Sequence, residues 1–305
     1  MPDLSALEVL VAVAHAGSLN AAAAELGRTQ QAVSARIASI ESQTGVSLVF
    51  RSPRGSSLTP AGVVVAEWAA RLLDGAAELD AGLASLRHDR RVRLRVAASL
   101  TIAEQLLPGW LVSFSTTARR LGAHPTDVTL TAANSDTVAA DVRAGAADLG
   151  FVEGPNAPRG VRNRVIGNDR LVLVVPPSHP WASRRSPVTP ARLAGTALVT
   201  RELGSGTREA LAVALRAAID ADAAAPTLEL STTAAVRAAV LAGAGPAVLS
   251  NLVVADDLAA GRLRVVAVAE VDLTRSLRAV WMGARTPPAG PVRDLIAIAS
   301  TGNRR

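Results

Sequence analysis

The chain of 305 residues contains no cysteine, no lysine and no tyrosine, and aromatic residues make up only 2% of it. The absence of cysteine excludes disulfides, thiolate metal sites and cysteine nucleophiles together. A Gly-x-Ser-x-Gly nucleophile elbow is also missing. The histidines have no spacing that would place two of them on one metal ion; they are His15, His88, His124 and His179. We therefore expect no cofactor, no metal and no enzymatic activity.

Targeting segments are missing as well. The N-terminus begins Met1-Pro2-Asp3, without the basic stretch and apolar run of a signal peptide. No uninterrupted apolar run approaches the roughly 20 residues that a membrane helix needs. These features predict a cytoplasmic protein with no membrane partner. A hydrophobic content of 49% supplies the cores of two or three compact units.

The net charge of +6 does not by itself indicate a nucleic-acid partner. All 32 basic residues are arginine, and the positive excess lies in the C-terminal part of the chain. Residues 1–60 are neutral, because four arginines are balanced there by four acidic residues. The local placement of charge, rather than its sum, must therefore decide whether a nucleic acid binds and where.

Three short helices are predicted at the N-terminus. Apolar side chains at helical spacing predict the first helix over residues 4–16. Ser18 is suited to cap a second helix over residues 19–26, and Thr29 a third that runs to about Thr44. The short turn with a glycine between the second and third helices is typical of a helix-turn-helix.

A hairpin and one long helix are predicted next. Residues 46–50 and 57–59 favour strands and are separated by turn-favouring residues, which indicates a hairpin or wing. The helix from residue 60 to about 87 spans about 40 Å at 1.5 Å per residue. Its apolar stripe consists of Val65, Trp68, Leu72, Ala76, Leu79, Leu83 and Leu86. A small winged domain cannot cover such a stripe, so we expect a second copy of the chain to pack on it.

From residue 91 onward, predicted strands alternate with helices, which indicates a mostly parallel α/β architecture. The apolar run 171–175 is expected to be a buried parallel strand. Strands are predicted at 92–98, 128–132, 148–152, 171–175, 197–200, 227–230 and 246–249, and helices at 102–120, 137–144, 208–219 and 234–242.

Residues 1–62 resemble the DNA-binding domain of LysR-type transcriptional regulators. The matching runs include Ser18-Leu19-Asn20-Ala21-Ala22-Ala23, Thr29-Gln30-Gln31-Ala32-Val33-Ser34 and Leu58-Thr59-Pro60-Ala61-Gly62. Looser matches follow downstream, so the resemblance covers nearly the whole chain. Gln31 stands where the family often has proline or serine, and the family's base preference therefore does not carry over.

The resemblance implies an α/β protein with an N-terminal winged helix-turn-helix, a long linker helix and a periplasmic-binding-protein-like effector domain of two α/β subdomains. The implied limits are residues 1–59 for the DNA-binding domain, 60–89 for the dimerisation linker helix and 90–305 for the effector-binding domain. Subdomain I would comprise about 91–162 and 268–300, and subdomain II about 163–267.

The third helix is the candidate for reading DNA. Val33, Ile37 and Ile40 share one face and are expected to pack inward. Gln30 and Gln31 then face outward, with amides that can pair with adenine edges. Arginines and hydroxyls around them can hold phosphates. The DNA-binding candidates are Ser18, Arg28, Thr29, Gln30, Gln31, Ser34, Arg36, Arg51 and Arg54. The alternatives are a solvated face for the helix, a solvated turn for Arg54 and an ion pair with a helix carboxylate for Arg51.

The turns after three predicted strands are the candidates for effector binding. Ligands of open α/β sheets bind outside the carboxyl ends of strands, near helix N-termini. The hydroxyls and amides of these turns suit a small anionic or polar metabolite. For each hydroxyl taken singly, helix capping is the alternative role. The candidates are Ser99, Leu100, Thr101, Asn134, Ser135, Thr200, Arg201 and Ser205.

The sequence thus predicts a LysR-type transcriptional regulator that binds promoter DNA as a dimer or tetramer and responds to a metabolite. Its expected partners are double-stranded DNA, a small-molecule effector, further copies of itself and RNA polymerase. One alternative is a solute-binding receptor without gene control, which would have a signal peptide and no winged domain. Another is an enzyme on the same scaffold, which would need a nucleophile, a metal cluster or a paired base.

Overall fold

The computed structural model divides into two compact units, residues 1–88 with 284–290 and residues 89–283 with 291–305. The residues that it describes are 2–52, 55–86, 93–122 and 125–302. Each of the two units has its own hydrophobic core.

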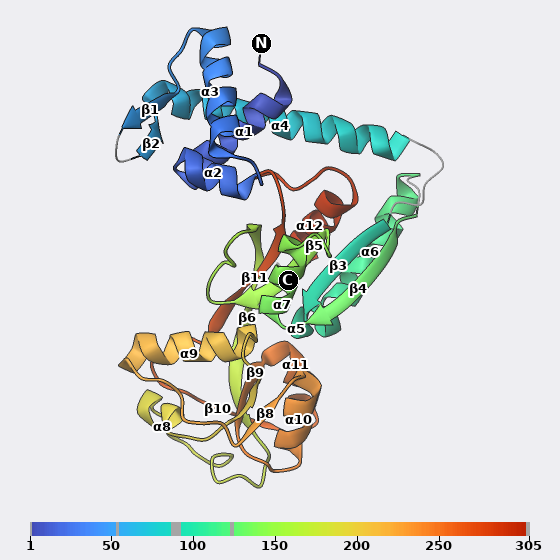
Figure 1. Ribbon diagram of the computed structural model, residues 1–305. Helices are drawn as coiled ribbons and strands as arrows, with labels where there is room; N and C mark the ends of the chain where they lie inside the picture. The colour runs from blue at the N-terminus through green and yellow to red at the C-terminus, as the bar shows by residue number, and fades with distance from the viewer. Residues whose placement is uncertain (1, 53–54, 87–92, 123–124, 303–305) are drawn as a thin grey trace. The chain divides into compact units, whose positions relative to one another are not determined.

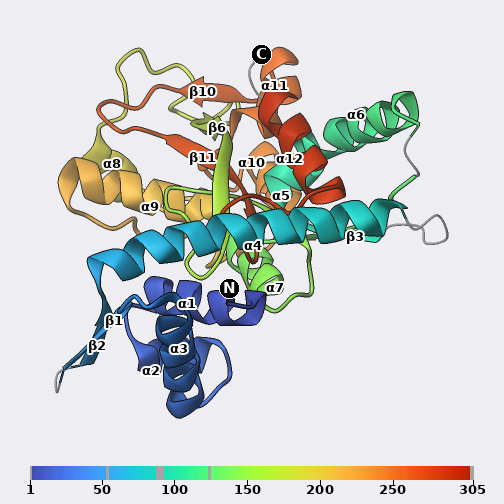
Figure 2. The same cartoon turned by 90° about the horizontal axis from the view of Figure 1, so that it is seen from above.

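The first unit begins with three short helices, as the sequence predicts (Figure 2). They are α1 (Leu4–Ala16), α2 (Leu19–Glu25) and α3 (Gln30–Thr44). Asp3, Ser18 and Thr29 cap them, since each side-chain oxygen accepts the backbone N–H three residues further on, at 2.7, 3.2 and 3.2 Å. These bonds satisfy donors that a helix start leaves without an intrahelical partner. The three predicted helix starts are therefore confirmed.

The wing pairs β1 (Val49–Ser52) with β2 (Gly55–Leu58) in an antiparallel hairpin. The hairpin exists where it was expected, but its first strand starts three residues later than the predicted residue 46. The Glu41 carboxylate of α3 accepts the backbone N–H groups of Leu48 and Val49, at 2.7 and 3.1 Å. These bonds hold the backbone before β1 against α3. The carbonyls of Leu48 and Ser47 accept the backbone N–H and the hydroxyl of Thr59, at 2.9 and 2.8 Å, just beyond the end of β2.

The long helix α4 (Pro60–Leu86) starts behind Thr59, whose hydroxyl oxygen accepts the Gly62 N–H at 2.8 Å. It packs on α1 through small buried residues, among them Ala66 and Ala69. A Cβ at Gly62 would lie 2.1 Å from the Leu48 carbonyl oxygen, so only glycine allows this approach. The small residues therefore form the face that α4 turns toward its own unit.

A different face of α4 stays uncovered. The predicted stripe contains Trp68, Leu72 and Leu79, which are 58%, 42% and 63% exposed. Val65 is half-buried, and the side chains of Leu83 and Leu86 lie outside the described residues. The structure thus agrees with the sequence that this stripe has no cover within its own domain.

The second unit is built around a mixed seven-stranded sheet of order β10-β6-β11-β5-β3-β4, with β9 also paired to β6 (Figure 1). Its strands are β3 (Arg93–Ser99), β4 (Asp127–Ala133), β5 (Leu149–Gly154), β6 (Arg162–Val175), β9 (Ala247–Ser250), β10 (Arg264–Val266) and β11 (Thr274–Trp281). Only the β3 pairings, with β4 and β5, are parallel in this sheet. A separate parallel pair joins β7 (Val199–Arg201) to β8 (Leu228–Leu230). The expectation of a mostly parallel sheet is therefore wrong.

The apolar run 171–175 explains this error. It forms the second half of β6 and pairs antiparallel with both β9 and β10. Leu171, Leu173 and Val175 enter one hydrophobic core, and Val172 and Val174 enter another. A strand that is buried on both faces is apolar throughout, whatever the direction of its neighbours.

One predicted helix is two in the structure. Residues 102–120 were expected to form a single helix, but α5 (Leu100–Gln105) ends before α6 (Leu107–Arg120) begins. Pro108 lies in the first turn of α6, where its missing N–H leaves no hydrogen bond unmade. The remaining helices are α7 (Ser135–Arg143), α8 (Pro190–Ala194), α9 (Gly206–Ile219), α10 (Thr233–Leu241), α11 (Asn251–Ala259) and α12 (Pro291–Gly302).

The second unit has hydrophobic cores on either side of a crossover. One core gathers side chains from β3, β5, β11, α6 and α12, and others gather around β9, α9 and α10. The first half of β6 pairs with β11 and its second half with β9 and β10, so β6 belongs to both parts. The subdomain limits expected from the sequence remain predictions, and the limit at 89/90 lies outside the described residues.

Replacing Asp257 of α11 with asparagine is expected to lower the free energy of unfolding of the second unit by about 1.5–3 kcal/mol, as for a charged hydrogen-bond network. The Asp257 side chain is completely buried and bonds Arg237 of α10 and Arg262, the latter at 2.7 Å. Urea unfolding measures the loss. Asp222→Asn is the control, because the pair of Asp222 with Arg216 is exposed.

The same variant should flatten the pH dependence of stability. Hydrogen bonds from Arg237 hold the pKa of Asp257 below its ordinary value; burial opposes them, and Arg262 adds to the lowering. The stabilisation is therefore present above the unfolded pKa of about 3.9 and is lost as the pH falls toward the folded value. An Asp257→Asn chain that keeps the native loss of stability between about pH 6 and about pH 3 would contradict this assignment.

Candidate DNA-binding and effector-binding sites

The helix α3 separates a buried face from a polar one. Val33, Ile37 and Ile40 are completely buried against the other helices, as predicted. Gln30 and Gln31 are exposed in the first turn. This orientation leaves both amides free for base edges in a major groove.

The other candidates around α3 have mixed roles. Ser18 and Thr29 cap α2 and α3, so their oxygens already accept one N–H each. Arg28 is exposed in the turn between these helices, and Ser34 is half-buried on α3. An exposed helix N-terminus with a nearby arginine is suited to a phosphate. Arg28 is therefore the best-placed described cation for the DNA backbone.

Arg36 is not a free cation. Its Nη2 lies 3.0 Å from both carboxylate oxygens of Asp3, the residue that also caps α1. The pair ties α3 to the start of α1. In the DNA-free chain the charge of Arg36 already has a partner, and its contact with a phosphate remains a prediction.

The wing candidates can be placed only in part. Arg51 lies in β1, but its side chain is outside the described residues, as is the whole of Arg54. Ser56 of β2 fixes the wing, because its hydroxyl oxygen accepts the Leu19 N–H at 2.9 Å. Phe50 on β1 is 59% exposed, and sequence reasoning did not single it out. DNA contact by the wing remains a prediction.

The end of β3 carries the first effector candidates. Ser99 is almost completely buried, and its hydroxyl has no hydrogen-bond partner within the described ranges. Thr101 is buried as well and donates to Oε1 of Glu153 at 2.9 Å. Leu100 is half-buried between them and offers no polar side-chain atom. Helix capping does not explain Ser99, because its side chain makes no cap hydrogen bond to α5.

The turn before α7 contacts the turn before α9. Asn134 caps α7 through the Thr137 N–H at 2.9 Å, and its Nδ2 donates to Oε1 of Glu202 at 3.2 Å. Ser135 donates to the Glu153 carbonyl at 2.9 Å. A Cβ at Gly206 would lie 1.8 Å from that carbonyl, so the start of α9 sits directly against it. Capping and close packing therefore account for both Asn134 and Ser135.

Arg201 is buried and already paired. Its Nε and Nη2 bond the two carboxylate oxygens of Glu202 at 2.7 and 2.8 Å, and Nη1 donates to Thr233 at 2.8 Å. Burial raises the pKa of Glu202, but the bonds and charge of Arg201 outweigh it and hold the pKa below its ordinary value. Arg201 is thus not free for an anionic ligand. Thr200 has a buried hydroxyl without a described partner, and Ser205 is buried at the start of α9 without a cap bond.

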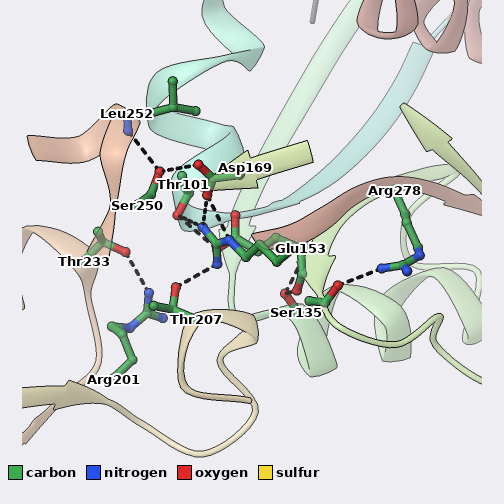
Figure 3. A network of polar contacts seen from close by, with 12 residues as sticks. Thr101, Ser135, Glu153, Asp169, Arg201, Thr207, Thr233, Ser250, Leu252 and Arg278 are labelled. Atoms are coloured by element: carbon green, nitrogen blue, oxygen red, sulfur yellow. Dashed lines mark hydrogen bonds and ion pairs between the residues drawn. The ribbon is translucent and has the colours of Figure 1, made fainter. Parts of the chain in front are cut away.

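A buried polar network at this site was missed by sequence reasoning (Figure 3). Arg275 of β11 is completely buried and pairs with Asp169 of β6 at 2.6 Å and with Glu153 of β5 at 2.9 Å. It also donates to the Thr207 hydroxyl at 2.8 Å, and Ser250 donates to Asp169 at 2.9 Å. One arginine therefore links four elements that lie far apart in the sequence.

A second buried arginine lies on the same strand. Arg278 donates to the carbonyls of Gly154 and Pro155 at 2.8 and 3.3 Å (Figure 3). Burial lowers its pKa, and the negative charge of Glu209 partly offsets this. It fixes the last residue of β5 and the one after it, next to Glu153.

The described residues hold neither a cluster of metal ligands nor a single membrane-spanning helix. Within residues 2–52, 55–86, 93–122 and 125–302, no three histidine, cysteine or acidic side chains gather as metal ligands would. In the same ranges no single helix has the length and apolar character to cross a membrane. The pair α1 and α2 meets both criteria only when joined, and it bends by 115° at the break.

Two family models match this chain. The model for "Bacterial regulatory helix-turn-helix protein, lysR family" matches residues 4–63, and that for "LysR substrate binding domain" matches residues 87–302. An uncharacterized HTH-type transcriptional regulator of Mycobacterium tuberculosis is 56% identical over 299 residues, which are 97% of this chain and 96% of that protein.

Solved structures have the same fold. A full-length OxyR variant from Pseudomonas aeruginosa gives a TM-score of 0.56 at 20% identity and covers 100% of both chains. Full-length CbnR complexed with its target DNA gives a TM-score of 0.50 at 24% identity over 99% of both chains. The expected fold class, a helix-turn-helix unit followed by a substrate-binding α/β domain, is confirmed.

Proposed function

This chain belongs to the LysR family of bacterial transcriptional regulators, and on that premise we propose that it binds promoter DNA as a dimer through α3 and responds to a small polar metabolite bound in its second unit. The observation that carries the DNA-binding proposal is the two-sided α3. Its aliphatic face is completely buried, while Gln30 and Gln31 stand exposed in its first turn. A recognition helix needs this division, because base edges are read by the exposed residues at its start.

The uncovered stripe on α4 supports dimerisation. Trp68, Leu72 and Leu79 are exposed apolar residues on one helix, and burying them against a second copy would remove apolar surface from water. A dimer would place two α3 helices about 34 Å apart, one turn of the duplex. We further propose that two dimers join into a tetramer and that the assembly contacts RNA polymerase.

The second unit supports effector sensing. Its buried polar network lies at the ends of β3 and β5, near the starts of α7 and α9. We propose that the effector binds there and shifts the unit between two arrangements, which changes the spacing of the DNA-binding units. No catalytic step is part of this function, and the regulator acts in the cytoplasm, where the chromosome is. A solute-binding receptor without gene control would not need the helix-turn-helix unit.

A mobility-shift titration on the DNA upstream of the chain's own gene tests the DNA-binding proposal. Arg28→Ala should weaken binding to all sequences alike and reduce the salt slope by about 1. Gln31→Ala should instead change the preference among sites, by about 1–3 kcal/mol at the base it contacts. If both variants bind every site as tightly as the native chain, the proposed docking of α3 is wrong.

A further inference from the structure

The buried network has an excess of negative charge. It contains the carboxylates of Glu153 and Asp169, which are 3% and 4% exposed, and a single guanidinium, that of Arg275. The neighbouring Arg201 is neutralised by Glu202, so it does not compensate this excess. A buried carboxylate without a compensating donor is costly.

The missing hydrogen-bond donor can be assigned to one oxygen atom of Glu153. Oε1 of Glu153 accepts from Thr101 at 2.9 Å and pairs with Arg275, also at 2.9 Å. Oε2 of the same carboxylate is buried and has no hydrogen-bond partner in the described part of the chain. Burial of an ionised oxygen normally requires a hydrogen-bond donor.

Two further unpartnered oxygens lie at strand ends in the same unit. The described residues contain four buried side-chain polar atoms without a partner, and three of them are Ser99 Oγ, Glu153 Oε2 and Thr200 Oγ1. They occur in the last two residues of β3, β5 and β7. Because β3 and β5 are parallel neighbours, Ser99 and Glu153 lie at the same edge of the sheet, which is where ligands of such sheets bind.

An exposed carboxylate borders this edge. Glu104 on α5 lies close enough to Arg201 and Glu153 to respond to both charges. Burial raises its pKa most; Arg201 opposes this, and the negative charge of Glu153 raises the pKa further. Five carboxylates, those of Glu104, Glu153, Asp169, Glu202 and Glu209, therefore face three guanidinium groups, those of Arg201, Arg275 and Arg278. This surplus makes an anionic effector a poor match.

Resting on the proposed effector sensing, we propose that the effector of this regulator carries a protonated amine, which donates to Oε2 of Glu153 at the end of β5. The ammonium group supplies the missing donor and offsets one unit of the surplus negative charge. The hydroxyl of Ser99, at the same edge of the sheet, is available for a polar group of the rest of the ligand. A divalent metal is a weaker match, because the described residues hold no group of three acidic or histidine ligands.

Two matched pools of small molecules test this on the full-length chain. One contains the common L-amino acids together with putrescine and ethanolamine. The other contains the corresponding 2-hydroxy acids, with the side-chain amine of lysine also exchanged, and glycols of matching length, so that each ammonium is replaced by a hydroxyl. We expect the amine pool to raise the melting temperature and the hydroxyl pool to leave it unchanged. Stabilisation by the hydroxyl pool alone, or by both pools equally, would overturn the ammonium assignment and leave effector sensing intact.

Variants locate the contact with the amine that gives the shift. Glu153→Gln should weaken its binding by about 10–100-fold, as expected for the loss of one charged hydrogen bond. Glu104→Gln should weaken binding of the amine less than Glu153→Gln does. Glu104 is exposed, so this substitution should leave folding intact. Glu229→Gln is the matched control, because Glu229 is 45% exposed and pairs with Arg208. Unchanged affinity in Glu153→Gln overturns the assignment, and a Glu153→Gln chain that fails to fold leaves Glu104→Gln and the pools to decide.

A small-molecule extract of bacterial cells distinguishes a failure of the ammonium assignment from a failure of the effector-sensing proposal. An extract that raises the melting temperature before, but not after, acetylation of its amines supports the assignment. A shift that survives acetylation overturns it. If neither the pools nor the extract shift the melting temperature, the effector-sensing proposal itself fails, and this inference fails with it.

Discussion

Arg275→Ala is expected to lower the free energy of unfolding of the second unit by about 3–5 kcal/mol. The substitution leaves the carboxylates of Asp169 and Glu153 buried without their guanidinium partner. It also removes the donor that the Thr207 hydroxyl accepts at 2.8 Å. The penalty comes mainly from uncompensated charge, because neither carboxylate can reach solvent where it lies.

Tryptophan fluorescence during urea unfolding measures this loss, since Trp110, Trp181 and Trp281 all belong to the second unit. Arg216→Ala is the control, because its pair with Asp222 is exposed and should change stability by less than about 0.5 kcal/mol. The combined Arg275→Ala and Asp169→Ala substitutions should cost less than the sum of the two single losses, since one removes the partner of the other. Additive losses would show that the ion pair does not carry the effect.

Local chemistry made the first unit predictable. Ser18 and Thr29 were assigned as caps from the few residues around them, and both accept the expected N–H. The burial of Val33 and Ile37 followed from their spacing alone. Helix caps and apolar periodicity depend on residues within one or two helical turns of one another, so they can be recognised without knowing which distant parts of the chain make contact.

The buried network was beyond this kind of reasoning. Arg275 and Asp169 are separated by 106 residues and meet only because β11 and β6 pair. No spacing in the sequence signals that meeting. The sequence did contain a weak indication of the network. Glu153 and Asp169 are charged residues within or next to apolar stretches of β5 and β6, where a buried charge needs a partner. The antiparallel pairing of β6 could not be predicted for a similar reason, because long-range contacts decide which strands pair and in which direction.

Arg36 has a partner that the sequence around it does not reveal. Its place on the polar side of α3 suggested a phosphate contact, but Asp3 reaches it from the start of α1. Asp3 lies 33 residues earlier and has a local role as a cap. A residue that serves two elements cannot be recognised from the sequence around either of them.

Leu72→Asp combined with Leu79→Asp is expected to convert the dimer to monomers and to abolish tight promoter binding. Both leucines are exposed in the single chain, so the substitutions should leave its folding intact. Complete burial of an exposed leucine contributes about 1.5–3 kcal/mol, and about half of that is left to gain at Leu72 and Leu79, which are 42% and 63% exposed. Symmetry doubles the loss, so the dimer should weaken by about 3–6 kcal/mol, which is about 10²–10⁴-fold. Sedimentation velocity measures the fraction of monomer. The mobility shift measures the affinity for promoter DNA, which should fall because a monomer contacts one half-site only.

Val63→Asp is the matched control for this pair. Val63 is also an exposed apolar residue of α4, at 46%, but it lies nine positions before Leu72 and so on the opposite side of the helix. The control should sediment as a dimer and bind promoter DNA like the native chain. If the Leu72 and Leu79 variant also stays dimeric, the α4 stripe is not the interface. If it is monomeric yet keeps native affinity for DNA, one copy of α3 is sufficient, and the spacing of two such helices cannot be what the effector changes.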